Sequence, residues 1–211
     1  MQSSKKYIQN NWQYILNLYL FINFLVYSCW YFYKILSEKR LDFIEGAFII
    51  QNFALTAVIL LRRPHKTIDK NIFHQIIAAI AFFSGVLFIG QDPNNNPQLH
   101  TASSIIVFIS LILGIITLFN LGRSFGILIA FRRVQTKGLY SIVRHPMYST
   151  DILLRIGFVI SHLNFFTIII FILSTACYVY RALLEEQFLQ LQPEYQDYMK
   201  KVNYRFIPYI F

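Results

Sequence analysis

The sequence is poor in charged residues. Only 14% of its 211 residues are Asp, Glu, Lys or Arg, whereas 56% are hydrophobic. A soluble domain usually carries about 25% charged residues. Long runs of Leu, Ile and Phe contain almost no charge, and hydrocarbon is the natural surrounding of such runs. We therefore expect one integral membrane domain, residues 1–211, rather than independent soluble cores.

Cysteine is also scarce, and this excludes two kinds of site. Cys29 and Cys177 are the only cysteines, and each lies inside an apolar run. Neither has a metal-ligating residue at short spacing, so the sequence contains no disulfide framework and no zinc motif. We expect no metal. Nothing in the sequence indicates an oligomeric state.

Six apolar runs are candidates for membrane spans. A hydrocarbon core of about 30 Å needs roughly 20 helical residues. The expected spans are residues 12–33, 44–61, 72–89, 103–119, 147–160 and 164–180. The fifth run is short and contains Asp151 and Arg155. The prediction is therefore an all-α membrane protein with five to six transmembrane helices, four of them within residues 1–120.

Acidic residues are few, and the basic residues set the predicted topology. The net charge is +9, and the Lys and Arg residues lie at the ends of apolar runs. If the chain has six spans, the N-terminus, two connections and the C-terminal tail all lie on one side of the membrane. Their basic residues are Lys5, Lys6, Arg62, Arg63, Lys66, Lys70, Arg123, Arg132, Arg133, Lys137, Arg144, Lys200, Lys201 and Arg205. The other side has basic residues only around Lys39 and Arg40. Both termini are therefore predicted to be cytoplasmic, and the charge is attributed to topology and anionic lipid rather than to nucleic acid.

The end of the chain has a different pattern. Apolar residues recur there at spacings of three and four, namely Leu184, Phe188, Leu191, Tyr195, Tyr198 and Val202. This spacing is typical of one face of an amphipathic helix. Pro193 interrupts the pattern and suits the first position of a second helix. We expect this segment to lie along the cytoplasmic interface.

The longest non-membrane stretch on the predicted cytoplasmic side is 122–146. Long loops in compact proteins usually have a function, although this one could also anchor anionic lipid. Gly138 permits a tight turn or a close approach to a ligand. Pro146 suits the first turn of a helix, which places His145 near an N-cap, where free amides can receive a carboxylate. Tyr148 offers a flat ring with a hydroxyl group.

A second cluster lies at the end of the sixth run. Arg181 and Glu185 are four residues apart and share one helix face, and Glu186 follows. In isolation this would be an ordinary ion pair at the membrane interface. The predicted topology, however, returns it to the side of His145 and Tyr148. Charges this close to hydrocarbon are candidate functional residues.

Both clusters resemble a known family. The stretch 137–148, KGLYSIVRHPMY, is similar to the motif of the isoprenylcysteine carboxyl methyltransferase family, which belongs to a wider group that includes membrane phospholipid methyltransferases. Residues 181–186, RALLEE, and the tail up to Pro208 also match. The resemblance covers about residues 121–208. Many relatives have glycine two residues after the motif tyrosine, where this chain has Thr150, followed by Asp151.

The resemblance implies a fold and a cofactor. Members of the family are helical membrane enzymes that bind S-adenosylmethionine in a cytoplasm-facing pocket without a Rossmann sheet, which would make 121–211 the cofactor-binding core. The implied cofactor-binding residues are Val134, Gln135, Tyr140, His145, Pro146, Met147, Tyr148 and Glu185. Arg181 corresponds to a position that the family uses near the substrate.

The expected function is methyl transfer to a lipid or lipidated acceptor, and the catalytic candidates are Arg181 and Glu186. A carboxylate acceptor, as in a prenylated cysteine, would suit a bidentate Arg181. An amine acceptor, as in a phospholipid headgroup, would need a base such as Glu186 or Asp151. The carboxylate is the expected acceptor, with N- or O-methylation of a phospholipid or another small apolar acceptor as the alternative.

The sequence also has features of two other classes of function. A non-catalytic module would bind anionic lipid through basic loops, above all Arg132 and Arg133. A small transporter or channel is disfavoured because the spans contain few charges, and Asp151 and Arg155 can pair at a spacing of four.

Overall fold

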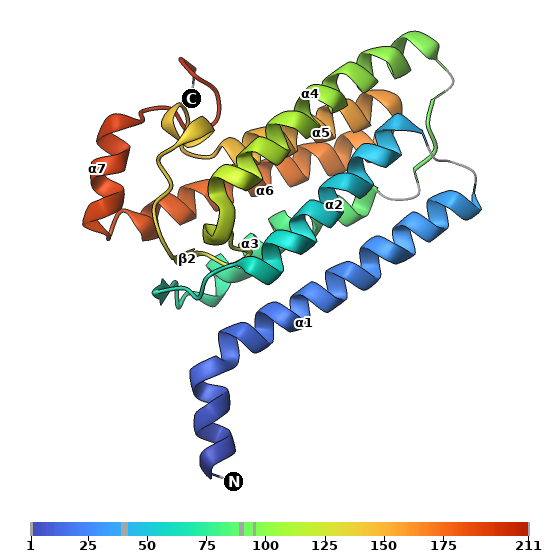
Figure 1. Cartoon of the computed structure of the whole chain (residues 1–211). Coiled ribbons are helices and arrows are strands. Elements are labelled where there is room, and N and C mark those ends of the chain that lie inside the picture. Colours follow the sequence, from blue (N-terminus) through green and yellow to red (C-terminus); the bar gives the residue numbers. More distant parts are fainter. Residues whose placement is uncertain (1, 39–41, 89–90, 95, 211) are drawn as a thin grey trace.

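The structure is a computed structural model that describes residues 2–38, 42–88, 91–94 and 96–210, with side chains described from residue 12 onward (Figure 1). The elements are α1 (Gln2–Ser37), α2 (Phe43–Leu61), β1 (Thr67–Ile68), α3 (Ile72–Phe83), η1 (Ser84–Phe88), α4 (Pro97–Leu121), η2 (Gly122–Ser124), β2 (Ala130–Phe131), η3 (Gly138–Ser141), α5 (Pro146–Ser161), α6 (Phe165–Leu189) and α7 (Pro193–Lys201). Three residues used in the predictions, Lys39, Arg40 and Ile89, lie outside the described residues.

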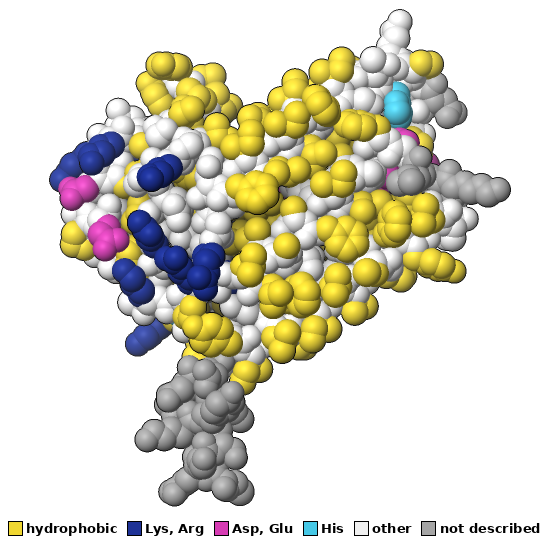
Figure 2. All heavy atoms as spheres, viewed as in Figure 1, with side chains coloured by type: hydrophobic (Ala, Val, Ile, Leu, Met, Phe, Trp, Pro, Cys, Tyr) yellow, Lys and Arg dark blue, Asp and Glu magenta, His cyan; other side chains and the backbone are white. Residues whose placement is uncertain are grey.

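Four of the described helices are long and apolar enough to cross a membrane. They are α1 from Trp12 onward, α2, α4 with η2, and α6, with mean hydropathy between 1.5 and 2.6. Hydrophobic side chains cover the flank that α1, α2 and α4 turn toward the viewer in Figure 2. The stretch formed by α3 and η1 is shorter, and so is α5. The mostly helical membrane fold is confirmed, whereas a total of five to six spans stays a prediction.

Short polar side chains mark where the helices begin. The amide of Glu45 donates to Asp42 Oδ1 at the start of α2, at 2.8 Å. Asn164 and Thr167 form a capping box at the start of α6. Such caps satisfy amides that lack a partner within the helix, and each is worth about 1 kcal/mol. Proline occupies the first position of α4, α5 and α7, as predicted for the last two.

Small residues bring α4 and α5 close together. A Cβ atom at Gly157 would lie 2.6 Å from Val107 Cγ2, so no larger residue fits there without movement. Ser110 Oγ donates to the carbonyl of Thr150 at 2.7 Å. In an apolar environment, close packing and hydrogen bonds between helices replace the hydrophobic effect as the attraction. The short helix α5 is therefore fixed on the longer α4.

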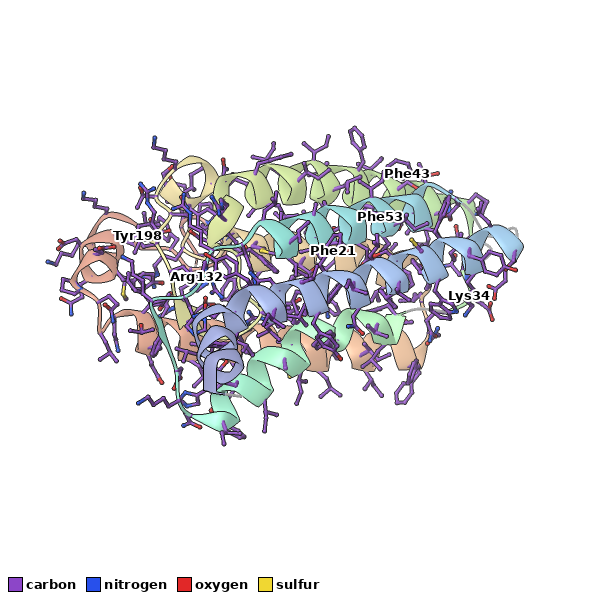
Figure 3. The ribbon with its side chains drawn as sticks, turned by 60° about the horizontal axis from the view of Figure 1, so that its bottom comes forward. Phe21, Lys34, Phe43, Phe53, Arg132 and Tyr198 are labelled. Carbon is purple, nitrogen blue, oxygen red and sulfur yellow. The ribbon has the colours of Figure 1, made fainter. Side chains whose placement is uncertain are left out.

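The connections predicted to share one side of the membrane lie at one end of the bundle. Strands β1 and β2 join the 62–71 connection to the 122–146 segment, with Thr67 opposite Phe131. In Figure 3, Arg132 and Tyr198 mark this end, and Lys34 and Phe43 mark the other. Exposed Lys and Arg side chains gather at the loop end in Figure 2. That this end faces the cytoplasm stays a prediction. The two short strands were not predicted, because two residues carry no periodic pattern.

The C-terminal segment differs from the prediction. Helix α6 does not end near Tyr180 but continues to Leu189, and α7 then begins at Pro193. The apolar face of α7 was expected at the membrane interface. Instead, Tyr195 and Tyr198 are buried inside the protein, and Tyr198 Oη donates to the carbonyl of Tyr140 at 2.7 Å. The face therefore covers the 122–146 segment.

Gly138 is a position where only glycine fits. Its φ is +61°, and a Cβ atom would lie 2.1 Å from Asn120 Nδ2. We predict that Gly138→Ala destabilises the fold by about 1–3 kcal/mol through backbone strain, in addition to the clash. Thermal unfolding in detergent measures this. Gly46→Ala is the control, because that position in α2 has no atom within 4 Å of an added Cβ. Equal melting temperatures for the two variants would contradict the prediction.

Candidate active site

A cavity of about 210 Å³ lies between the helices, and its lining includes residues of the 122–146 segment at the loop end of the bundle. One part of its wall is polar and aromatic and comes from 132–148, α6 and α7, with Arg132, Gln135, Tyr140, His145, Tyr148, Glu185, Tyr195 and Tyr198. The other part comes mainly from α1, α2, α3, η1 and α5 and is mostly apolar, with Phe24, Tyr27, Phe48, Leu55, Phe82, Phe83, Val86, Phe88 and Leu154. The cavity therefore joins two different environments.

Most of the predicted site residues line this cavity. They are Val134, Gln135, Tyr140, His145, Met147, Tyr148, Arg181 and Glu185. Pro146 and Glu186 do not belong to the wall. Pro146 is the first residue of α5 and fixes where that helix begins, and His145 is its N-cap, as predicted. The structure thus brings the two sequence clusters together around one cavity.

The contact between the two clusters is made by Tyr148 and Glu185. Tyr148 Oη donates to Glu185 Oε2 at 2.6 Å. The ring of His145 stacks on that of Tyr148, with centroids 5.4 Å apart and planes 6° apart. The guanidinium of Arg181 lies 5.2 Å from the centroid of the Tyr148 ring. Glu185 forms no ion pair within 4 Å among the described residues, although the cations Arg132 and Arg181 lie close enough to interact with its negative charge.

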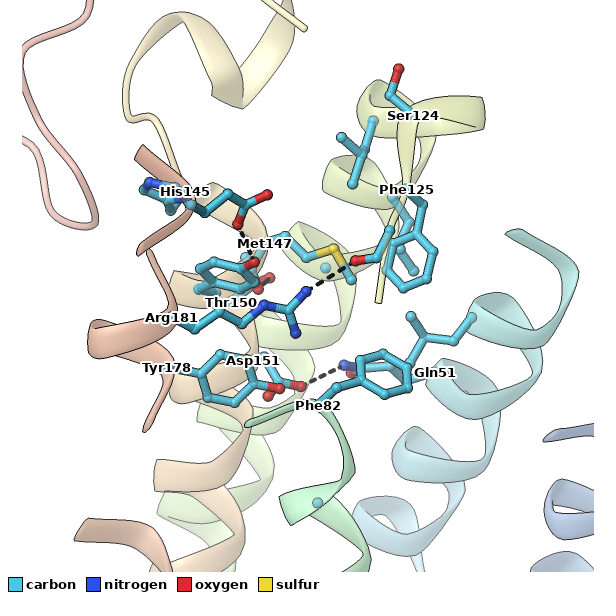
Figure 4. A pocket seen from close by; sticks show the side chains of 18 of the residues that line it. Gln51, Phe82, Ser124, Phe125, His145, Met147, Thr150, Asp151, Tyr178 and Arg181 are labelled. Atoms are coloured by element: carbon cyan, nitrogen blue, oxygen red, sulfur yellow. Dashed lines mark hydrogen bonds between the residues drawn. The ribbon is translucent and has the colours of Figure 1, made fainter. Parts of the chain in front are cut away.

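Arg181 is held by backbone carbonyls, which differs from the predicted bidentate grip. Its Nη1 donates to Ala78 O at 3.0 Å, and its Nη2 donates to Gly126 O at 3.0 Å and to Ile127 O at 2.8 Å. Figure 4 shows Arg181 among the residues that line the cavity. These bonds would have to be exchanged before both Nη groups could hold a carboxylate. Among the described residues, Arg181 Nε is buried without a hydrogen-bond partner. This atom could therefore donate to a ligand without breaking an existing hydrogen bond.

Glu186 is surrounded by three basic side chains. Arg144 Nε lies 2.7 Å from its Oε1, His145 Nε2 lies 3.1 Å from the same oxygen, and Arg205 Nε lies 2.9 Å from Oε2. Glu186 is also buried and lies outside the cavity wall. Its position does not support the predicted role as a base for an amine acceptor. It joins the start of α5 and the C-terminal tail to α6.

Residues 97–192 match the model of the phospholipid methyltransferase family. The matched segment begins at the first residue of α4 and ends directly before α7, so it contains both clusters. Residues 97–192 form a phospholipid methyltransferase domain. This family is part of the isoprenylcysteine carboxyl methyltransferase-like group, which confirms the resemblance seen in the sequence. Its members are methyltransferases, which implies that this chain is an enzyme. No curated protein matches the chain.

Three residues that line the cavity were not among the predicted site residues. Tyr195 and Tyr198 of α7 close the polar part of the cavity, and Arg132 lines it. Burial, together with the nearby Arg62, lowers the pKa of Arg132 to about 10, although Glu185 acts in the opposite direction. Arg132 therefore remains a cation at neutral pH. No local pattern could have shown that α7 folds back onto the cavity.

A polar group inside the bundle was only partly foreseen. Arg155 Nε pairs with Asp151 Oδ2 at 2.9 Å, as the spacing of four predicted. Arg155 Nη1 also donates to Ser84 Oγ at 2.8 Å, and Gln51 Nε2 donates to Asp151 Oδ1 at 3.2 Å. The sequence feature that indicates this polar group is the pair Gln51-Asn52 inside an apolar span. Polar side chains at such positions cost free energy in hydrocarbon and are usually functional.

The contrast between two adjacent glutamates gives a prediction. Glu186→Gln removes the charge that pairs with Arg144, His145 and Arg205, and removing one partner from a buried ion pair costs about 3–5 kcal/mol. We expect a marked fall in melting temperature, measured by thermal unfolding in detergent. The matched control is Glu185→Gln, which removes a charge one residue away without breaking an ion pair. A larger loss of stability in the control would contradict the anchoring role of Glu186.

Proposed function

We propose that this chain is an S-adenosylmethionine-dependent methyltransferase that acts on a lipid or lipidated acceptor at the cytoplasmic face of its membrane. The observation that carries the proposal is the position of Glu185 and Tyr148 at the polar part of a cavity whose other part is apolar. A water-soluble cofactor and a lipid need such different surroundings. The match to the phospholipid methyltransferase family supports the reaction class.

The polar part of the cavity has the chemistry to hold S-adenosylmethionine. When bound, this cofactor supplies a methyl group on a positively charged sulfur, and it also carries an ammonium group. Glu185 presents a negative charge to such cations, and its hydrogen bond from Tyr148 fixes its direction. Tyr140 and Tyr148 offer flat buried surfaces for an adenine ring. Burial, and secondarily Glu185, raises the pKa of Tyr140 well above its ordinary value, so this wall is neutral.

The remaining predicted cofactor residues divide into two kinds. Val134, Gln135, His145 and Met147 line the cavity and are proposed to contact the cofactor directly. Pro146 is proposed to act through the backbone, because it begins α5 and so positions Met147 and Tyr148. No metal is required for these contacts. Among the described residues there is also no group of three or more His, Cys, Asp or Glu that could bind one.

The apolar part of the cavity is proposed to receive the acceptor. It reaches between α1, α2 and α3, and several of its aromatic residues belong to helices that are apolar on their outer faces as well. A lipid that enters sideways from the membrane would keep its chain in hydrocarbon while its head approaches Arg181. Alignment of the acceptor in a dry cavity supplies much of the rate in such a reaction.

Two acceptor classes agree with these contacts. A prenylated cysteine carboxylate could accept a hydrogen bond from Arg181 Nε, and this agrees with the family to which 137–148 is similar. A phospholipid headgroup agrees with the description of the family that matches residues 97–192. Exposed Arg123, Arg133 and Lys137 at the loop end support a cytoplasmic orientation for both termini and for the polar part of the cavity.

Binding of the cofactor tests the proposal. The full chain in detergent should bind S-adenosylmethionine in calorimetry, and Glu185→Ala should weaken this binding by about tenfold or more, because charged groups lose the most when a partner is removed. Lys66→Ala is the control, since Lys66 is exposed and lies outside the cavity. A folded protein that shows no binding would overturn the proposal. Binding of anionic vesicles that is lost only when Arg132 and Arg133 are neutralised would then favour the non-catalytic lipid-binding module.

A further inference from the structure

A buried oxygen of Gln51 has no hydrogen-bond partner among the described residues. This atom, Oε1, belongs to a side chain that points from α2 into the cavity (Figure 4). Buried polar atoms are nearly always paired, and an exception calls for an explanation. The amide cannot simply be turned round, because Gln51 Nε2 donates to Asp151 Oδ1 at 3.2 Å. Exchanging the two atoms would place an oxygen against a carboxylate.

The unpaired oxygen lies beside a small gap in the wall of the cavity. The gap is at Gly114 of α4, where an added Cβ atom would lie 4.0 Å from Gln51 Oε1 and 3.8 Å from Thr150 Oγ1. The hydroxyl hydrogen of Thr150 is already used, because Oγ1 donates to the carbonyl of Met147 at 3.0 Å. Toward the gap, Thr150 can therefore act only as an acceptor.

Asp151 completes this group of oxygens and is held in place. Its Oδ2 pairs with Arg155 Nε at 2.9 Å. Arg155 is 3% exposed, and it is fixed in turn by Ser84 Oγ at 2.8 Å and Tyr178 Oη at 3.2 Å. A polar group with this many fixed contacts is preorganised, so it can distinguish ligands by their hydrogen bonds.

The group lies within the membrane-spanning part of the bundle. Gln51 precedes the last residue of α2, Leu61, by ten positions, which is about 15 Å along a helix. The cavity wall around it includes Phe48, Phe88 and Leu154. An oxygen that lacks a donor at this depth is costly in the absence of a ligand, and the apolar surroundings suit a lipid chain.

We propose that Gln51, Thr150 and Asp151 form a subsite for the head of the methyl acceptor, and that this head donates hydrogen bonds, as an amine or a hydroxyl group does. The inference rests on the proposed methyltransferase function and names the class of its acceptor. A carboxylate has no hydrogen to give to Gln51 Oε1, and its charge would face Asp151. Arg181 Nε would favour a carboxylate, so the two unpaired atoms make opposite predictions that one experiment separates.

The experiment compares three ligands with the same chain. Dodecylamine, dodecanol and dodecanoate are titrated into the full chain in detergent with S-adenosylmethionine present, and competition with a fluorescent lipid reports their affinities. The amine or the alcohol should bind about tenfold more tightly than the carboxylate, since a site with an unmet acceptor favours ligands that donate. Tighter binding of dodecanoate would overturn the proposal. Preference for the amine over the alcohol, or the reverse, identifies which donor the subsite takes.

Variants of the subsite make the test specific. Gln51→Met keeps the length of the side chain but removes both polar atoms, and it should abolish the preference while cofactor binding is unchanged. If this variant does not fold, Thr150→Val serves instead and should reduce the preference. Asn23→Leu is the matched control, because Asn23 is an exposed polar residue in α1 outside the cavity. A preference that survives in Gln51→Met, or in Thr150→Val where that variant takes its place, would overturn the proposal.

The two proposals fail in different ways. Loss of S-adenosylmethionine binding in the unaltered protein refutes the methyltransferase function itself. Normal binding of the cofactor together with tighter binding of dodecanoate, or with a preference that the subsite variant retains, refutes only the acceptor subsite. In that case Arg181 Nε would be the group that selects the acceptor, and Arg181→Lys should alter the affinity for dodecanoate more than Gln51→Met does.

Discussion

The arrangement of the site depends on the charge of Glu186. This carboxylate is 4% exposed and forms hydrogen bonds with the side chains of Arg144, His145 and Arg205. These three residues belong to the 122–146 segment and the C-terminal tail. The guanidinium groups of Arg144 and Arg205 would repel each other at the end of the bundle without Glu186. With it, the start of α5 is fixed against α6. Tyr148 and Glu185, which lie next to these residues in the chain, then meet across the cavity.

The features that were predictable from the sequence are local ones. Pro146 and Pro193 indicated where α5 and α7 begin, Gly138 indicated a tight turn, and the spacing of Asp151 and Arg155 predicted their pair. The structure gives Gly138 a positive φ, as such a turn allows. Each depends on a few neighbouring residues and on backbone geometry. The motif in 137–148 and the RALLEE stretch at 181–186 were found separately, and only helix order suggested that they meet.

The features that were not predictable depend on contacts between distant segments. Glu185 and Glu186 look alike in the sequence, yet one faces the cavity and the other is surrounded by cations. Adjacent residues on a helix point about 100° apart, so their surroundings are decided by what packs on each side. Arg181 was predicted to bind the substrate, but its Nη groups donate hydrogen bonds to the backbone carbonyls of residues 78, 126 and 127. No local sequence pattern predicts that the segments with these carbonyls pack against Arg181.

Helix α5 connects the polar and the apolar parts of the cavity. It has 16 residues and is about 24 Å long, less than the hydrocarbon core of about 30 Å. Its residues at 147, 148, 151, 154 and 155 recur at helical spacing and all line the cavity, from the cofactor motif to the apolar part. Charges on such a helix would be costly in lipid. They are tolerated here because α4 packs closely on one side and residues of α2, η1 and α6 meet the polar groups on the other. A longer, wholly apolar α5 would span the membrane more easily but would place no polar group between the polar and the apolar parts of the cavity.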